Sequence, residues 1–289
     1  MLKTLIHIQS FLNKLTQSLL SIPKIILWSR KSKLPQPTKK ELVILGNGPS
    51  LQDFLKENID FLNKKQSLAV NHFADTEIYS QIQPDFYVIN VPEFWTDDVD
   101  DNVLKRRNQL IENLVEKTHW NMNLLLGMGA KKSKLWRNLS KRNPHLKIYF
   151  FNVTPIEGFR FFKHFCYRNQ LGMPRPHNVL IPSLINAINM GFKKIYLAGA
   201  DHNWMKEIFV ADDNTVYLTQ KHFYDLQTAR PEVMKKTGKD KRKLHEILHK
   251  FMLAFQGYFD INDYSNRQNV QIINITRNSF IDAFKRQKL

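Results

Sequence analysis

The chain has 289 residues, enough for one α/β domain with appendages, and its 43% hydrophobic and 12% aromatic content excludes a disordered protein. Its single cysteine, Cys166, excludes an internal disulfide framework and a cysteine-based zinc cluster, and is typical of the reducing cytoplasm. The formal net charge of +17 favours polyanionic partners. The basic residues concentrate at 24–40 and 235–250 without interleaved aromatic residues, which disfavours a nucleic-acid surface.

Residues 2–28 carry apolar side chains mostly three or four positions apart, which predicts an amphipathic helix. No uncharged apolar run reaches the ~18 residues of a spanning helix, and no signal-peptide cleavage site is recognisable. Because basic residues follow directly, we expect residues 1–34 to attach to the anionic inner face of the cytoplasmic membrane. The alternative is packing on the protein's own core or on another subunit of a homo-oligomer. Residues 35–40, with a Pro-Gln-Pro sequence, are expected to link this segment to a catalytic domain at 41–289.

Short apolar runs alternate with helical patterns over the rest of the chain. This alternation predicts an α/β, Rossmann-like fold with a mostly parallel sheet flanked by helices. The predicted strands are residues 41–45, 67–70, 86–89, 123–126, 148–151, 194–198 and 270–275, and the predicted helices are residues 103–115, 181–190 and 244–255. The polar stretch 203–240 has weak periodicity, so we expect long loops or a lid over the site.

Ligands of a parallel sheet bind beyond the carboxyl ends of its strands, so the residues that follow each strand are the site candidates. They are Gly46, Asn47, Gly48, Pro49 and Ser50 after the first strand, Asn71 and Asn90 after the next two, and Gly199, Asp201 and His202 after residues 194–198. Glycines permit positive φ and close backbone approach, and a proline begins a helical turn whose free amides face an anion. The first loop is therefore predicted to cradle a phosphate, although a plain strand-to-helix turn explains it equally well. Asparagines offer donors and acceptors to a base or sugar, and are also common turn residues.

The segments GNGPSL, VNHF, Asn90-Val91-Pro92 and MGFKKIYLAGAD follow one another in this order. Together they resemble the bacterial family-42 sialyltransferases and the wider group of GNGPSL-containing proteins of surface-polysaccharide and flagellar-glycan loci. The resemblance spans residues 41–224. It implies a single-Rossmann, GT-A-like glycosyltransferase fold, a CMP-activated donor such as CMP-sialic acid or a related keto-sugar, and a glycan or lipid-linked acceptor in lipopolysaccharide or capsule synthesis. It also implies that no metal or other cofactor is required.

The resemblance also implies roles for individual residues. Asn47, Gly48 and Ser50 line the donor phosphate and sugar, Asn71 and Asn90 contact the nucleoside or donor sugar, Asn178 faces the donor carboxylate or phosphate, and Gly199 and Asp201 hold the nucleoside. A transferase needs a base for the acceptor hydroxyl, and His222 is the candidate, with Tyr224 on the leaving phosphate and His202 as the second candidate base. The family's Arg-x-x-Ser-Gly pattern is replaced here by Arg-Pro-His-Asn-Val at residues 175–179.

Two other motifs point to metals. The letters HEILH at residues 245–249 match the His-Glu-x-x-His zinc motif, which suggests a zinc hydrolase acting through His245 and His249. No third ligand is recognisable downstream, so a chance match on a surface helix is the alternative. Asp212 and Asp213 form either an Asp-x-Asp type of metal site or an exposed turn. A non-catalytic nucleotide-binding or membrane-scaffold protein and a Rossmann-like pyrophosphokinase acting on a pterin are the other functional classes that stay open.

Overall fold

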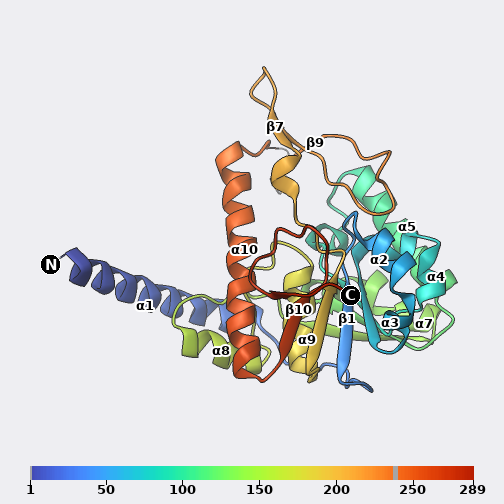
Figure 1. Cartoon of the computed structure of the whole chain (residues 1–289), viewed down its shortest axis with the longest axis horizontal. Helices are drawn as coiled ribbons and strands as arrows, with labels where there is room; N and C mark the ends of the chain where they lie inside the picture. The colour runs from blue at the N-terminus through green and yellow to red at the C-terminus, as the bar shows by residue number, and fades with distance from the viewer. Residues whose placement is uncertain (1, 237–239) are drawn as a thin grey trace.

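The computed structural model describes residues 2–236 and 240–289, and an eight-stranded parallel sheet forms its centre (Figure 1). The strand order is β11-β10-β6-β1-β2-β3-β4-β5. The strands are β1 (Glu41–Leu45), β2 (Gln66–Val70), β3 (Phe86–Ile89), β4 (Met122–Gly127), β5 (Leu146–Phe151), β6 (Lys194–Ala198), β10 (Gln271–Asn274) and β11 (Lys285–Arg286). The predicted Rossmann-like α/β fold is therefore confirmed.

Helices cover both faces of this sheet. One face carries α8 (Arg160–Arg168), α9 (Leu180–Met190) and α10 (Leu244–Arg267), and the other carries α2 (Leu51–Glu57), α3 (Ile59–Asn63), α4 (Ile78–Ile82), α5 (Asp101–Lys117), α6 (Lys134–Arg137) and α7 (Leu139–Arg142). Strand β1 shows why both faces are covered, because Leu42 and Ile44 enter one core while Val43 and Leu45 enter the other. Successive residues of a strand point to opposite faces, and an apolar run without alternation requires burial on both.

Short 3-10 helices follow four of the strands on the way to the next element. They are η1 (Asn71–Asp75), η2 (Pro92–Trp95), η3 (Met128–Lys132) and η4 (Trp204–Lys206). Helix α10 continues well beyond the predicted residue 255, because Tyr258, Ile261 and Tyr264 keep burying the same face of the helix. Its Gly257 allows a close approach to α9, where an added Cβ would lie 3.0 Å from Ile181.

Part of the stretch predicted as long loops is instead a second, antiparallel sheet. It contains β7 (Ile208–Val210), β8 (Val216–Leu218) and β9 (Glu232–Val233) and stands beyond the end of the main sheet, next to the start of α10 (Figure 1). Val216 and Leu218 pack there against Ile247 and Phe251 of α10, in a small core separate from the two main ones. Strands of two or three residues are too short to show a period in the sequence.

The predicted first helix is confirmed as α1 (Leu2–Trp28), which extends away from the body of the molecule (Figure 1). Ser18 and Ser21 connect it to the loop before α8, where they accept hydrogen bonds from the backbone amides of Phe159 and Glu157. The segment that follows α1 is packed rather than free, since Leu34 is buried and Ser32 donates to the Phe150 carbonyl. Within the described residues, no helix combines the length and apolar character needed to cross a membrane.

Candidate functional site

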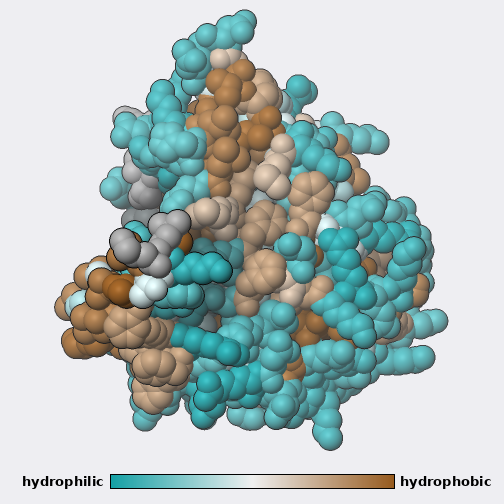
Figure 2. Space-filling model, turned by 60° about the vertical axis from the view of Figure 1, so that its left-hand side comes forward, coloured by the Kyte–Doolittle hydropathy of each residue, from teal (hydrophilic) through white to brown (hydrophobic). Residues whose placement is uncertain are grey.

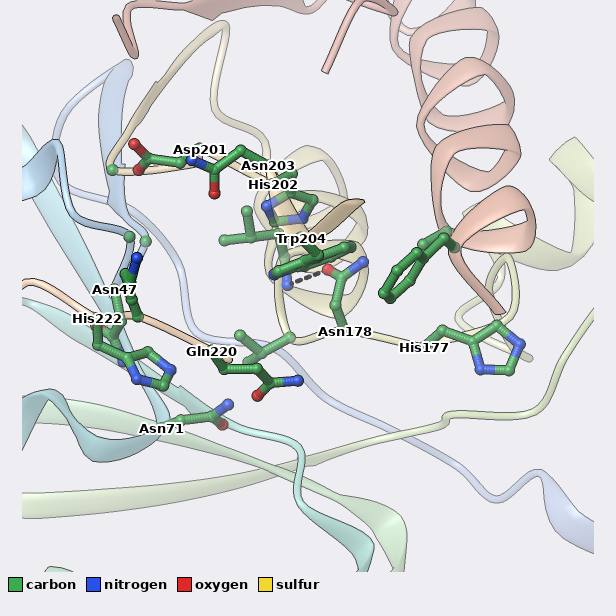
Figure 3. Close-up of a pocket in the computed structure, with 18 of the residues that line it drawn as sticks. Asn47, Asn71, His177, Asn178, Asp201, His202, Asn203, Trp204, Gln220 and His222 are labelled. Atoms are coloured by element: carbon green, nitrogen blue, oxygen red, sulfur yellow. Dashed lines mark hydrogen bonds between the residues drawn. The ribbon is translucent and has the colours of Figure 1, made fainter. Parts of the chain in front are cut away.

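A cleft of about 320 Å³ opens beyond the carboxyl ends of β1, β2, β3 and β6 (Figure 3). It lies where the strand order reverses, because β2 adjoins β1 on one side and β6 adjoins it on the other. Eleven predicted residues from separate loops line it: Gly46, Asn47, Gly48, Pro49, Asn71, Asn90, Asn178, Gly199, Asp201, His202 and His222. Of the residues predicted for the site, Ser50 and Tyr224 lie outside this lining.

The loop after β1 is bound tightly to the loop after β6. The Gly46 amide donates to the Ala198 carbonyl at 2.8 Å, and the Gly48 amide donates to the Gly199 carbonyl at 2.9 Å. A Cβ added to Gly48 would lie 2.0 Å from Asp201 Oδ2, and one added to Gly46 would lie 2.5 Å from the Gly199 oxygen. The close approach of the two loops therefore requires glycine at positions 46 and 48. The glycine with a positive φ, of 65°, is Gly199.

Asp201 takes the place at the start of α2 that we expected a phosphate to take. Its Oδ2 accepts from the Ser50 hydroxyl at 2.8 Å, and its Oδ1 lies 3.3 Å from the Ser50 amide. Burial raises the pKa of this carboxyl, and the hydrogen bonds from Ser50 oppose the rise. The amides of Gly48 and Ser50 are thus engaged within the protein, contrary to the prediction that this turn offers free amides to a ligand phosphate.

Three asparagines on the β1, β2 and β3 loops form one wall of the cleft. Asn47 Nδ2 donates to the Val70 carbonyl at 3.0 Å, while its Oδ1 is buried without a hydrogen-bond partner in the described structure. Asn71 has a left-handed backbone with φ of 46°, and its Oδ1 accepts from the Asn90 amide at 3.4 Å. The Tyr87 hydroxyl donates to the Asn71 carbonyl at 2.5 Å and fixes that turn. The wall therefore offers at least one unpaired acceptor, Asn47 Oδ1.

A chain of three side chains forms the opposite wall. Asn178 Oδ1 accepts from the amide of Leu180 at 2.9 Å, which is the dashed line at Asn178 in Figure 3. It also accepts from the amide of Ile181 at 3.3 Å and from the Tyr258 hydroxyl at 3.0 Å. Because Tyr258 donates there, its oxygen accepts from His202 Nε2, 2.5 Å away. His202 is thereby fixed as the tautomer with a proton on Nε2. Asn178 Nδ2 is left buried and without a partner in the described part of the chain.

His202 is unsuited to the role of second candidate base. Burial lowers its pKa to about 3, and its ring centroid lies 4.1 Å from that of Trp204, with the two planes tilted by 33°. A base works best when its pKa lies near the working pH, and an imidazole with so low a pKa gains little from taking a proton. His202 instead orients Tyr258, and through it Asn178.

His222 has the surroundings of an oriented base. Its backbone amide donates to Asp225 Oδ1 at 2.5 Å, and its Nδ1 lies 3.0 Å from Asp225 Oδ2. A proton on Nδ1 that is shared with a carboxylate leaves Nε2 free as an acceptor. The ring lies at the edge of the cleft near Asn71 and Gln220 (Figure 3), and the side chain is 31% exposed. The neighbouring Phe223 amide donates to the Asn47 carbonyl at 3.0 Å, which fastens this segment to the β1 loop.

Tyr224 lies behind His222 instead of inside the cleft. The two rings are stacked with centroids 5.1 Å apart and planes 2° apart. Tyr224 lines a neighbouring groove, together with Gln52 and Asp75. This position contradicts the expectation that Tyr224 reaches a phosphate in the cleft, and makes it a support for the His222 ring.

Sequence reasoning missed several residues of the cleft, chiefly Trp204, Gln220 and Lys250. Lys250 is half-buried, and burial together with Arg242 lowers its pKa. None of the salt bridges in the described part of the chain involves Lys250. In the sequence Lys250 is one of many lysines beside an amphipathic stripe, so only the packing of α10 shows that it lines the cleft. Trp204 gave a weak signal as a large aromatic residue in a polar stretch.

The zinc interpretation is not supported. His245 and His249 are exposed, and Glu246 is engaged by the Lys243 amide at 2.8 Å and by Lys236 at 2.7 Å. Among the described residues, no group of three or more His, Cys, Asp or Glu side chains is close enough to hold a metal ion. Asp213 accepts from the amide and hydroxyl of Thr215 at 2.9 and 2.8 Å, as in a turn.

The fold and the site define a Rossmann-like α/β protein with a ligand cleft at the switch point of its parallel sheet. No protein-family model matches the chain, and no curated protein matches it. Among solved structures it is similar to the MAf glycosyltransferase from Magnetospirillum magneticum AMB-1, with 11% sequence identity and a TM-score of 0.47. The similarity covers 96% of this chain and 38% of the length of that protein.

Proposed function

We propose that the protein is a glycosyltransferase that moves a sialic acid-like or other keto-sugar from a CMP-activated donor to a glycan or lipid-linked acceptor. The observation that carries this proposal is the pair His222 and Asp225, whose free imidazole nitrogen borders a cleft with unpaired amide groups. His222 takes the proton of the acceptor hydroxyl while the oxygen of that hydroxyl bonds to the anomeric carbon of the donor sugar. The bond from that carbon to the phosphate oxygen breaks, and CMP leaves with the electron pair.

The cleft offers groups that suit a nucleotide-sugar. Its volume of about 320 Å³ is at the lower end of the usual range for small-molecule sites. Asn47 Oδ1 presents an acceptor and Asn178 Nδ2 a donor, each buried and unpaired among the described residues. A ligand that satisfies both removes the free-energy cost of leaving them unpaired.

We assign the donor phosphate to Lys250 instead of the glycine loop. The amides of Gly46, Gly48 and Ser50 are bound within the protein, whereas Lys250 is a half-buried cation without a salt bridge in the described chain. A fixed positive charge beside the leaving phosphate stabilises the charge that develops there, which is the role a metal ion has in other transferases. We therefore expect turnover without a metal. The choice of CMP over other nucleotides rests on the sequence resemblance.

The pair His222 and Asp225 is tested by CMP release from CMP-sialic acid, with and without a sialyl acceptor such as lactose. We expect His222→Ala to lower turnover about 10²-fold or more while the affinity for CMP is kept. His245→Ala is the matched control, since His245 is exposed on α10. Near-normal turnover of His222→Ala would remove the proposed base.

Screening by thermal shift against CMP, CDP, UDP and GDP tests the donor. A ligand at 100 times its Kd stabilises a protein by about 2.7 kcal/mol. Stabilisation by CMP together with turnover supports the transferase, while stabilisation without any turnover supports the non-catalytic nucleotide-binding alternative. Selective stabilisation by UDP or GDP would exclude a CMP-linked donor.

A further inference from the structure

The first helix, α1, carries an unusually large apolar surface that the described chain leaves uncovered. Seven residues spaced alternately three and four apart form one stripe along the helix, and each is between 37% and 71% exposed: Leu5, Ile8, Leu12, Leu15, Leu19, Ile22 and Ile26. The helix contacts its own chain on a different side, through Ser18 and Ser21. Packing within this chain therefore does not account for the stripe.

Helix α8 adds to the same surface. Phe11 of α1 packs on Phe159 at 5.2 Å, and Phe159 stacks on Phe161 at 5.7 Å, which connects the two helices through aromatic rings. Phe161 and Phe165 are 68% and 62% exposed. Figure 2 shows brown, apolar side chains gathered at the lower left of the view, apart from a second brown strip higher up, and an exposed apolar patch of this kind marks a surface that docks on something.

The charge around this surface has a single sign. Residues 1–40 contain no Asp or Glu, and their Lys and Arg residues are Lys3, Lys14, Lys24, Arg30, Lys31, Lys33, Lys39 and Lys40. Trp28, 56% exposed, ends the helix just before Arg30, Lys31 and Lys33. Apolar residues beside Lys and Arg, with a tryptophan at the boundary, suit the interface of an anionic bilayer.

A second copy of the chain is the other occupant that this spacing suits, because alternate intervals of three and four also form a coiled-coil seam. Pairing two α1 helices would bring together two wholly cationic segments, with no acidic side chain in either to form a salt bridge. Anionic lipid provides the missing negative charge. We propose that α1 and the α8 phenylalanines form a membrane-docking surface that lies in the interface of an anionic bilayer.

The test is flotation of the full chain with vesicles of phosphatidylcholine alone and of phosphatidylcholine with phosphatidylglycerol. We expect binding to the anionic vesicles, with weaker binding as salt increases. The double variant Leu12→Glu with Leu19→Glu should lower the partition coefficient by about tenfold or more, and Phe161→Ser with Phe165→Ser should lower it less. Gln9→Glu with Gln17→Glu is the matched control, because it adds the same charge at exposed polar positions of α1.

All of the substituted side chains are exposed, so thermal unfolding should be unchanged and loss of binding is not loss of folding. Two outcomes would overturn the proposal. One is a wild-type chain that fails to float with anionic vesicles, and a dimer that becomes a monomer in the leucine variant would then identify a second copy as the occupant. The other is equal flotation of the leucine and glutamine variants.

Discussion

At the scale of single residues, the orientation of one amide group decides what the cleft can recognise. Asn178 Oδ1 accepts from two backbone amides and from Tyr258, so the side chain cannot turn over without losing all three hydrogen bonds. The group that faces a ligand is therefore the Nδ2 donor, and the ligand atom opposite it is an acceptor. His202 holds this arrangement from behind through the Tyr258 hydroxyl.

The low pKa of His202 predicts a loss of stability in acid. The ordinary pKa of an unfolded histidine is about 6.5 and burial lowers that of His202 to about 3, so between these values only the unfolded state takes up the proton. The contribution is present above about pH 6.5 and decreases by about 1.4 kcal/mol per pH unit on acidification. His202→Gln keeps a donor for Tyr258 and does not titrate. Urea unfolding between about pH 6 and pH 4 should be less pH-dependent in this variant by about one proton, and an unchanged slope would contradict the assignment.

Lys250 gives a second prediction at this scale. If it holds the donor phosphate, Lys250→Met should lower the affinity for CMP about tenfold or more, because a partly desolvated charge pair is lost. It should leave the affinity for cytidine, which lacks the phosphate, nearly unchanged. Calorimetric titration of both ligands checks this, with the exposed Lys243→Met at the start of α10 as the control. Equal weakening of both ligands would place Lys250 away from the phosphate.

At the scale of elements, α10 connects the main fold to the small sheet of β7, β8 and β9. One turn of the helix carries Ile247 and Phe251 against Val216 and Leu218. The same stretch of α10 also lines the cleft, together with Lys250 and Ala254. The segment with His222 begins four residues after β8 ends, so this small core positions the proposed base together with the hydrogen bond from the Phe223 amide to Asn47.

We therefore expect Ile247→Ala to loosen the small sheet before the main fold. Ile247 is fully buried, and truncation of a buried isoleucine costs about 2–5 kcal/mol. Hydrogen exchange should become faster across β7 to β9 and stay slow in β1 and β6. Leu248→Ala, next in the chain but 42% exposed, is the matched control. Equal protection of β8 in the two variants would show that the small sheet does not depend on this core.

At the scale of the whole molecule, the sequence predicts the scaffold better than the site. The ranges of β1, β3 and β6 agree with the predicted strands, because short continuous apolar runs buried on both faces give a clear signal. The rule that ligands bind beyond strand ends selected nine of the residues that line the cleft, and the family resemblance and the need for a base added Asn178 and His222. The hydrogen bonds from Ser50 to Asp201 and the place of Lys250 could not be predicted, since both depend on contacts between segments far apart in the chain.

The docking surface and the cleft lie on different elements, which predicts that they can be separated by mutation. The variant Leu12→Glu with Leu19→Glu should keep wild-type turnover with a soluble acceptor, because neither residue lines the cleft. Its turnover should decrease severalfold with a glycolipid acceptor in anionic vesicles, where attachment raises the local concentration. Rate measurements with both acceptors check this. A loss in both assays would show that α1 affects the site itself.

The way α1 is held also has a consequence for the order of events during synthesis. Ser21 contacts Glu157, which lies 136 residues further along the chain. At ribosomal rates of about 5–20 residues per second, several seconds pass between the synthesis of α1 and that of the loop to which it is hydrogen-bonded. Throughout that interval its apolar stripe is exposed on the nascent chain. The docking that we propose for α1 could therefore begin before the loop that anchors the helix exists, and the chain would then start to fold while attached to lipid.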